Sequence, residues 1–256
     1  MKTIVGNWKM HLGIRESVAL ARGVVRHLRG KLETPDLVLC PSFTSLSEVH
    51  KVLARSRVSL GAQDVGFDRT GPYTGAISAA MLQDVGCGYV IIGHTERRRF
   101  FGETDQMIEK KISTIDDSKL TPIVCIGESF TKNPADAQQE ILRQLDVFQG
   151  FDLPRGRKLY IAYEPVWSVG TGKPADVGAA VEIIGLIRDT MASRFGLKSP
   201  QLRVLYGGSI DPKNAYQFLR EAQIDGLMVG AESIKLQSFE KIIDAAIDVM
   251  NAQAKL

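Results

Sequence analysis

The chain contains 256 residues, of which 44% are hydrophobic and 24% charged, and its 32 basic and 29 acidic side chains give a formal net charge of +3. This composition is typical of a globular protein and excludes the disordered, collagen-like and disulfide-scaffold classes. The near balance of charge argues against nucleic acid as a partner, and no run of about 18 apolar residues predicts a membrane span.

Short apolar runs recur along the whole chain and predict its β-strands. They are continuous rather than alternating, a pattern typical of parallel strands buried on both faces. In chain order the predicted strands cover residues 3–8, 37–40, 58–62, 89–92, 122–126, 159–163, 204–206 and 226–229. Eight strands over 256 residues give 32 residues per unit, which is enough for a strand followed by a crossover helix.

Amphipathic patterns between the strands predict helices over residues 17–28, 45–54, 107–115, 137–148, 177–195, 212–220 and 239–250. Ser45 and Glu48 have the spacing of a capping box, and Pro134 suits a first helical turn. Alternating strands and helices indicate a parallel sheet with helical crossovers. We therefore expect one domain over residues 1–256, an α/β protein folded as a closed (β/α)8 barrel. An open doubly wound sheet is the alternative.

The three cysteines, Cys40, Cys87 and Cys125, each lie in an apolar, strand-like run. Their odd number and the absence of metal-ligand spacing indicate buried, reduced thiols. Such thiols fit a cytoplasmic protein. The first residues also lack the apolar stretch of a signal peptide, so we expect a cytoplasmic location.

In a closed parallel barrel the functional site lies at the carboxyl ends of the strands. Asn7 lies near the end of the first apolar run and Lys9 directly after it. His94 and Glu96 follow the fourth run, and Glu164 follows the sixth. Burial at a strand end can raise the pKa of a carboxylate toward the range of a general base. Taken singly, Glu164 could be a solvated loop residue, His94 a structural histidine and Lys9 a surface cation. Their placement on one rim favours a site.

Glycine-rich turns follow the seventh and eighth runs, at residues 207–209 and 230–232. Each turn leads into a helical pattern. Backbone N–H groups at the start of a helix bind an anion without a charged side chain. The two turns therefore predict a phosphate site on the same rim.

Two loops are longer than the usual connections of a compact domain. Residues 165–175 read PVWSVGTGKPA, with proline near both ends and glycines inside. That pattern predicts a stiff lid on two hinges. Residues 64–78 are rich in glycine and could form either a lid or a subunit-docking arm.

Several motifs together make the sequence resemble the triosephosphate isomerase family. They are GNWKM at residues 6–10, AQD at 62–64, YTG at 73–75, GHTERR at 93–98, FGET at 101–104, CIGE at 125–128, YEPVWSVGTGK at 163–173, YGGS at 206–209 and DGLMVG at 225–230. Agreement of so many motifs in this order is highly specific. It covers the chain from residue 5 to near its C-terminus.

The resemblance implies interconversion of dihydroxyacetone phosphate and D-glyceraldehyde 3-phosphate, a reaction of glycolysis and gluconeogenesis, through an enediolate. Glu164 would carry the proton between the two carbons, and neutral His94 would polarise the carbonyl oxygens, as is described for this family. Lys9 would supply positive charge to the substrate and the enediolate, and Asn7 would supply a hydrogen bond. Glu96 would be a supporting residue of the site. Both half-reactions are proton transfers, so the resemblance implies no metal and no other cofactor.

The resemblance also implies the binding residues. The predicted substrate and phosphate ligands are Asn7, Lys9, Gly170, Ser209, Gly230 and Ala231. The predicted lid residues are Pro165, Val166, Trp167, Val169, Gly170, Thr171, Gly172 and Lys173, and Tyr206 and Ser209 would fasten the closed lid. Residues 64–78 become the arm of a homodimer, with Thr74 reaching the site of the partner subunit.

Three departures from the family pattern bear on the site. Thr95 stands where the family usually has serine, and Ala231 and Glu232 alter the turn after the eighth strand. Ala231 is harmless only with a negative φ, and the charge of Glu232 weakens phosphate binding unless it points away or is paired. The altered turn motivates an alternative, an isomerase of a related phosphorylated ketose such as a tetrulose phosphate. A catalytically silent barrel that acts as a binding module, and a Schiff-base aldolase on Lys9, are further alternatives.

Overall fold

The computed structural model describes residues 1–116, 118–129, 133–154 and 156–254. Its strands are β1 (Thr3–Asn7), β2 (Asp36–Cys40), β3 (Val58–Ala62), β4 (Tyr89–Ile92), β5 (Thr121–Ile126), β6 (Leu159–Tyr163), β7 (Leu202–Tyr206) and β8 (Gly226–Val229). Its α-helices are α1 (Ile14–His27), α2 (Leu46–Leu53), α3 (Ala79–Asp84), α4 (Thr95–Phe101), α5 (Asp105–Asp116), α6 (Pro134–Leu145), α7 (Val177–Phe195), α8 (Ala215–Leu219) and α9 (Leu236–Gln253). Short 3-10 helices are η1 (Phe43–Ser45), η2 (Asp146–Phe148) and η3 (Ala231–Ile234).

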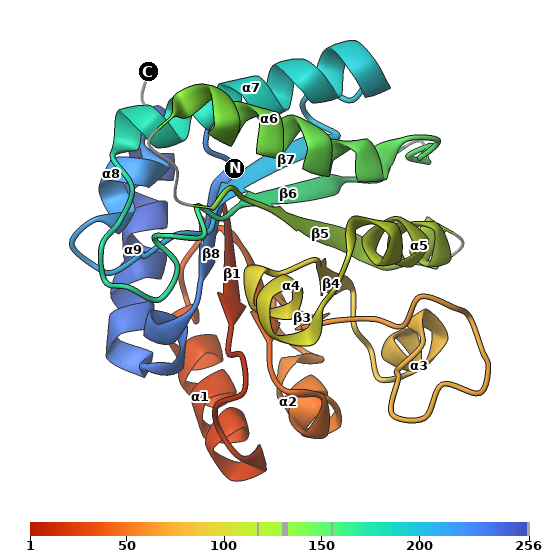
Figure 1. Ribbon diagram of the computed structural model, residues 1–256. Helices are drawn as coiled ribbons and strands as arrows, with labels where there is room; N and C mark the ends of the chain where they lie inside the picture. The colour runs from red at the N-terminus through yellow and green to blue at the C-terminus, as the bar shows by residue number, and fades with distance from the viewer. Residues whose placement is uncertain (117, 130–132, 155, 255–256) are drawn as a thin grey trace.

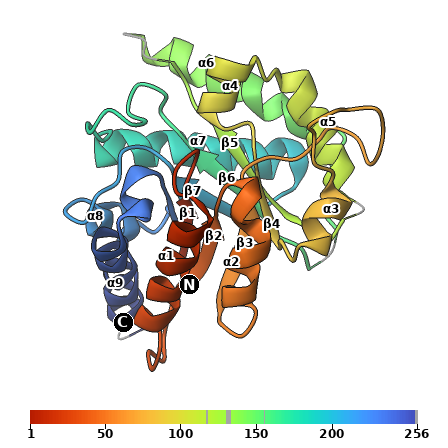
Figure 2. The same ribbon diagram turned by 90° about the horizontal axis from the view of Figure 1, so that it is seen from below.

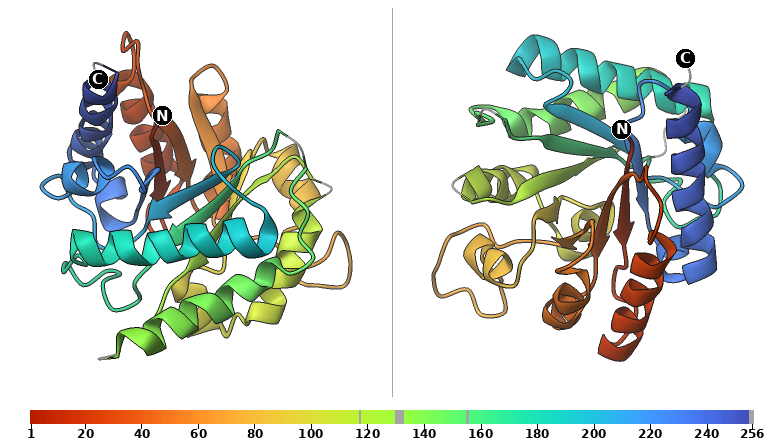
Figure 3. Two further views of the ribbon diagram at one scale, coloured as in Figure 1. Left: turned by 90° about the horizontal axis from the view of Figure 1, so that it is seen from above. Right: turned by 180° about the vertical axis from the view of Figure 1, so that it is seen from behind.

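The strands form a closed ring with the helices around it (Figure 1). Each strand pairs in parallel with its neighbour in sequence, and β1 also pairs with β8; Val5 lies opposite both Val38 and Met228. The first and last helices, α1 and α9, therefore lie side by side where the ring closes (Figure 2; Figure 3, right). The predicted (β/α)8 barrel, the TIM-barrel fold, is confirmed, and the open doubly wound alternative is wrong.

The continuous apolar runs have a direct explanation in the packing of the barrel. Alternate residues of each strand point into the ring and out toward the helices. On β1, Val5 belongs to a buried cluster made of strand residues alone, whereas Ile4 belongs to the larger cluster shared with the helices. Both positions are buried, so both must be apolar.

The predicted strands agree closely with the observed ones, and α7 has the predicted bounds. The capping prediction at Ser45 is wrong, because η1 precedes α2 there and the carboxylate of Glu48 instead pairs with Lys51 at 2.5 Å. Pro134 does lie in the first turn of α6, where Asn133 Oδ1 accepts from the Ala135 N–H. The short helices α3 and α4 were not predicted.

Two segments stand out from the regular alternation. The loop of residues 64–78 projects beside α3 at the edge of the molecule (Figure 1, Figure 2). Its ends are joined by a hydrogen bond from the Gly66 N–H to the Ile77 carbonyl at 2.7 Å. The second segment, residues 165–173, connects β6 to α7. In the part of the chain that the structure describes, no helix has the length and apolar character to cross a bilayer.

Candidate active site

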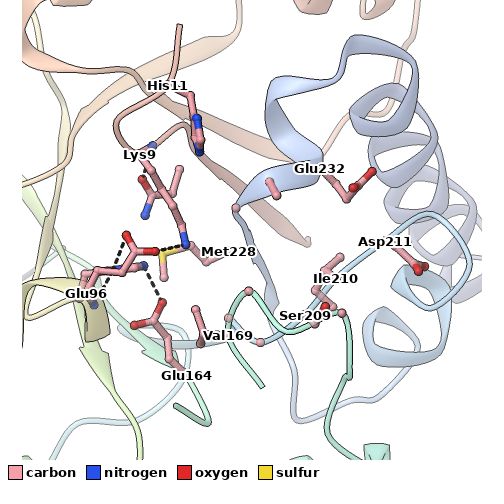
Figure 4. Close-up of a pocket in the computed structure, with 18 residues that line it drawn as sticks. Lys9, His11, Glu96, Glu164, Val169, Ser209, Ile210, Asp211, Met228 and Glu232 are labelled. Carbon is pink, nitrogen blue, oxygen red and sulfur yellow. Dashed lines mark hydrogen bonds and ion pairs between the residues drawn. The ribbon is translucent and has the colours of Figure 1, made fainter. Parts of the chain in front are cut away.

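A pocket of about 390 Å³ opens at the carboxyl ends of the strands (Figure 4). The predicted residues that line it are Asn7, Lys9, His94, Glu96, Glu164, Gly170, Ser209, Gly230 and Ala231. They lie at the end of β1 or after β1, β4, β6, β7 and β8, so closure of the barrel brings residues from distant parts of the sequence to one rim. This is the end of a parallel barrel at which sites are found.

Glu164 lies at the end of β6 and its side chain is almost fully buried. Its backbone N–H donates to the Ile126 carbonyl at 2.8 Å, which continues the sheet past the last strand residue. Close approach of β5 and β6 requires glycine at position 127, because a Cβ there would lie 1.7 Å from the Glu164 carbonyl oxygen. The backbone of two strands thus fixes where the carboxylate begins.

Several donors surround the Glu164 carboxylate. The backbone N–H and the hydroxyl of Thr95 each donate to Oε2 at 3.1 Å, and His94 Nε2 lies 3.0 Å from Oε1. Burial by itself raises the pKa of Glu164, but the charge and hydrogen bonds of His94 and the Thr95 N–H outweigh it, and the pKa is lowered. The expectation of a raised pKa is therefore wrong for this arrangement, because donors stabilise the ionised form.

His94 is held at the start of α4 and is also buried. Its Nδ1 accepts a hydrogen bond from the Glu96 N–H at 3.2 Å, so the ring caps this helix. A nitrogen that accepts from an N–H carries no proton, so the geometry assigns the ring proton to Nε2, which donates to Glu164. Burial lowers the pKa of His94 while the Glu164 carboxylate raises it, and the net pKa is raised as long as the two side chains are paired.

Lys9 extends into the pocket from the segment after β1. Its ammonium lies 2.5 Å from Glu96 Oε1 (Figure 4). Its backbone has φ of 52°, a left-handed conformation that non-glycine residues rarely adopt. Two contacts hold it there: the Lys9 N–H donates to Asn7 Oδ1 at 3.1 Å, and Gln63 Nε2 donates to the Lys9 carbonyl at 2.8 Å. The position of this cation is thus set by its neighbours.

The two glycine-rich turns form the other side of the pocket. Ala231 opens η3, and its φ is not positive, because Lys9 and Leu12 are the non-glycine residues with positive φ in the described chain. The condition under which alanine is harmless at this position is therefore met. Glu232 Oε1 pairs with Lys235 Nζ at 2.7 Å, and its Oε2 accepts from the Ser238 hydroxyl. Its side chain points away from Lys9 and Glu164 (Figure 4).

The predicted lid borders the pocket through Val169, Gly170 and Gly172. The two glycines have positive φ, which lets the segment turn sharply over the site. Further contacts attach the lid to the body. The Ala175 N–H donates to the Tyr206 hydroxyl at 3.0 Å, and the Ser209 N–H donates to Ser168 Oγ at 3.2 Å.

The other lid residues, Pro165, Val166, Trp167, Thr171 and Lys173, do not line the pocket. Trp167 Nε1 donates to Glu128 Oε1 at 3.1 Å, and the Thr171 hydroxyl donates to the Ser168 carbonyl within the lid at 3.0 Å. These bonds shape the segment rather than contact the pocket.

One predicted residue lies elsewhere, and others were missed. Thr74 is exposed in the projecting loop and does not line the pocket of its own chain. Gln63 and Thr95 support Lys9 and Glu164, and His11 and Asp211 line the pocket, but none had been assigned these positions. Gln63 directly follows the third apolar run, so extending the strand-end rule to that strand would have found it.

The described residues contain no group of three or more histidine, cysteine, aspartate or glutamate side chains placed to hold a metal ion. What the pocket does offer is a carboxylate, an imidazole and a lysine beside glycine-rich turns. A closed parallel barrel with this pocket at its carboxyl end is of the class of barrel enzymes that carry out acid–base chemistry.

The chain is similar to proteins of one known family over nearly its whole length. The sequence model of the family "Triosephosphate isomerase" matches residues 2–246. The triosephosphate isomerase of Moorella thermoacetica is 40% identical over 245 residues, which cover 94% of this chain and 97% of that protein. That of Thermoanaerobacter sp. strain X514 is 40% identical over 244 residues, covering 94% and 98%. The crystal structure of the Bartonella henselae enzyme has a TM-score of 0.83 at 34% identity and covers 95% of this chain and 98% of that chain.

These matches extend over nearly the whole length of the chain and of its relatives. The chain belongs to the triosephosphate isomerase family.

Proposed function

We propose that the pocket at the carboxyl end of the barrel is where this chain performs the activity of its family. That activity is the interconversion of dihydroxyacetone phosphate and D-glyceraldehyde 3-phosphate. The main support for this proposal is that Glu164, His94 and Lys9 line one pocket. The glycine-rich turns form the opposite wall of the same pocket. A base, a proton donor and a cation beside an anion site are the groups that this reaction needs.

In the proposed mechanism Glu164 takes a proton from the carbon next to the carbonyl group. The electron pair of the broken C–H bond forms a carbon–carbon double bond, and the carbonyl oxygen becomes an enediolate oxygen. Glu164 then returns the proton to the neighbouring carbon. At the same time the hydroxyl proton of the first carbon passes to the former carbonyl oxygen, so that the former hydroxyl oxygen becomes the new carbonyl oxygen. While Glu164 is paired with His94, the lowered pKa keeps its carboxylate ionised, which is the form that can accept a proton.

The remaining rim residues would stabilise the charge that develops on oxygen. The Nε2–H of His94 is the donor that would move from Glu164 to the substrate oxygens once substrate separates the pair. Lys9 supplies positive charge, Asn7 orients the segment that carries Lys9, and Glu96 positions the ammonium. Backbone contacts hold the segments that carry these groups near the pocket before substrate binds.

The phosphate group would lie against the backbone N–H groups of Gly170, Ser209, Gly230 and Ala231. Closure of residues 165–173 over the substrate would exclude water, which strengthens each electrostatic contact and protects the enediolate from losing phosphate. The bond from the Ala175 N–H to the Tyr206 hydroxyl supports a fastening role for Tyr206. The Ser209 N–H, which donates to Ser168 Oγ in this structure, would turn to the phosphate when substrate binds.

The geometry weighs against the alternatives. Glu232 is turned away and paired, so the altered eighth turn gives little reason to prefer a tetrulose phosphate. The complete set of rim residues argues against a silent binding module. A Schiff-base aldolase needs a neutral amine, whereas Lys9 is ion-paired with Glu96.

A coupled assay with each triose phosphate, run beside one with a tetrulose phosphate, tests the substrate. Triose phosphates should be turned over far faster. Faster turnover of the tetrulose phosphate would favour the ketose-phosphate alternative, and no turnover of either would favour the binding module.

We also propose that the chain forms one domain and works as a homodimer in the cytoplasm. Large apolar side chains are exposed on and around the projecting loop: Tyr73 is 40% and Met81 59% exposed, and both line one small hollow. Met10, just after Lys9, is 95% exposed. Exposed apolar surface of this kind marks a protein interface. Through it Thr74 would reach the site of the partner subunit.

A further inference from the structure

Glu232 places a negative charge in the wall of a pocket proposed to bind a phosphate dianion. It directly follows Ala231, one of the proposed phosphate ligands, and it is the second residue of η3. A carboxylate facing that site would repel the substrate, and in a half-buried pocket the repulsion is screened less than in open solvent. The position of this one side chain therefore matters for substrate affinity.

Two partners hold the Glu232 carboxylate on the outer side of the loop. Lys235 Nζ lies 2.7 Å from Oε1, and the Ser238 hydroxyl donates to Oε2. Glu232 itself is 23% exposed, and Figure 4 shows its side chain directed toward α9 rather than toward Lys9. Each carboxylate oxygen thus has its own donor outside the pocket. These two donors also lower the pKa of Glu232, so the group is charged throughout the physiological range.

We propose that Lys235 and Ser238 act as a latch that keeps the Glu232 carboxylate out of the pocket, and that this latch sets the affinity of the site for phosphate-bearing substrate. The inference rests on the proposed function of the pocket. Lys235 and Ser238 are positioning residues, because they act through Glu232.

The latch must be separated from a simpler role for Lys235. A surface ion pair contributes little to stability, so the pair need not be there for folding. The ammonium of Lys235 could, however, attract phosphate directly. The two roles differ in a variant that lacks Lys235, Ser238 and the charge of Glu232. If Lys235 acts only through Glu232, substrate affinity should be normal in that variant. If Lys235 attracts phosphate directly, substrate affinity should stay weakened.

The test compares steady-state kinetics of the double variant Lys235→Met/Ser238→Ala with those of the triple variant that also carries Glu232→Gln. In the double variant the freed carboxylate should raise KM by about three- to tenfold while kcat changes by less than about twofold. The rise should shrink as salt is added, since screening weakens charge repulsion. The triple variant should return KM to the wild-type value. Lys241→Met, at an exposed lysine on α9, is the matched control and should leave KM unchanged.

An unchanged KM in the double variant overturns the latch. A raised KM that persists in the triple variant also overturns it and assigns the effect to the charge of Lys235 itself. Binding of inorganic phosphate, measured by calorimetry on the same variants, gives the same comparison without turnover. If the wild-type chain failed to isomerise triose phosphates, the proposed function would be wrong, but the phosphate affinities would still decide whether the latch exists.

Discussion

Glu164 carries its charge in a site that is almost completely buried, and neighbouring donors compensate for the loss of water. Two of these come from Thr95 and one from His94. The carboxylate is thus held at a defined place and kept ionised. Both its position and its ionisation can be tested with single substitutions.

Shortening the base tests its position. Glu164→Asp withdraws the carboxylate by one methylene while keeping its charge, and misplacing a reacting group by about 1 Å can cost about a hundredfold in rate. We expect kcat to fall by about that factor with little change in KM, measured by the coupled assay. Glu182→Asp, the same change at an exposed position of α7, is the control and should leave both parameters unchanged. An unchanged kcat in Glu164→Asp would contradict the assignment of the base.

Replacing Thr95 tests the ionisation of Glu164. The Thr95 hydroxyl donates to the charged form of the carboxylate, so it contributes to the lowered pKa. Because the base must be deprotonated, kcat/KM falls as pH drops through the pKa of Glu164. Thr95→Val removes the donor and should move this acid limb to higher pH. Thr95→Ser keeps the hydroxyl and should leave the limb in place; equal profiles for the two variants would contradict the expected role of this bond.

Ion pairs connect separate elements beside the pocket. Lys111 of α5 lies 2.6 Å from Asp64 Oδ1, just after β3, and 2.5 Å from Glu103 Oε1, between α4 and α5. Arg97 of α4 contacts the same two carboxylates at 2.9 Å each. Lys111 and Glu103 are buried, and burial is the main cause that raises the pKa of Asp64. This network anchors the base of the projecting loop to the helices around His94.

Breaking the network should cost stability. Lys111→Met leaves the carboxylates of Asp64 and Glu103 with Arg97 alone, and loss of one partner of a buried charge group typically costs about 3–5 kcal/mol. We expect the free energy of unfolding, measured in urea, to fall by about that amount. The matched control is Lys51→Met, which removes the exposed Lys51–Glu48 pair and should cost less than about 1 kcal/mol. If Lys111→Met and Lys51→Met lowered the free energy of unfolding equally, the buried network would contribute no more to stability than an exposed ion pair.

The whole molecule presents apolar side chains where the projecting loop meets α3. In solution these are expected to be covered by a second copy of the chain. Thr74→Arg places a bulky charge at the tip of the proposed arm, so the variant should be monomeric at micromolar concentration by analytical ultracentrifugation, and less active. Leu32→Arg, at a position that is 88% exposed and between α1 and β2, should remain dimeric. A wild-type chain that sediments as a monomer would rule out the proposed dimer.

The pattern of apolar residues predicted the strands more accurately than the short helices. Strands buried on both faces must be apolar throughout, so runs such as residues 159–163 and 226–229 marked β6 and β8 to the residue. The helices α3 and α4 have six and seven residues, so neither extends over more than two turns of a helical repeat. The five residues of α8 were predicted only as part of a longer pattern over residues 212–220. The strand-end rule placed Asn7, Lys9, His94 and Glu164 on one rim because a parallel barrel brings all carboxyl ends together.

The sequence by itself therefore determined the eight-unit barrel, the rim that carries the chemistry and the family. The tertiary structure decided the properties that depend on contacts between distant segments. Burial alone predicted a raised pKa for Glu164, but Thr95 and His94, brought from another strand, lower it. The φ of Ala231 and the direction of Glu232 could not be read from their identities, because local backbone geometry and the placement of Lys235 and Ser238 set them. Composition and periodicity predict which residues are buried. The pKa and the direction of a charged side chain depend on the particular partners that folding places beside it.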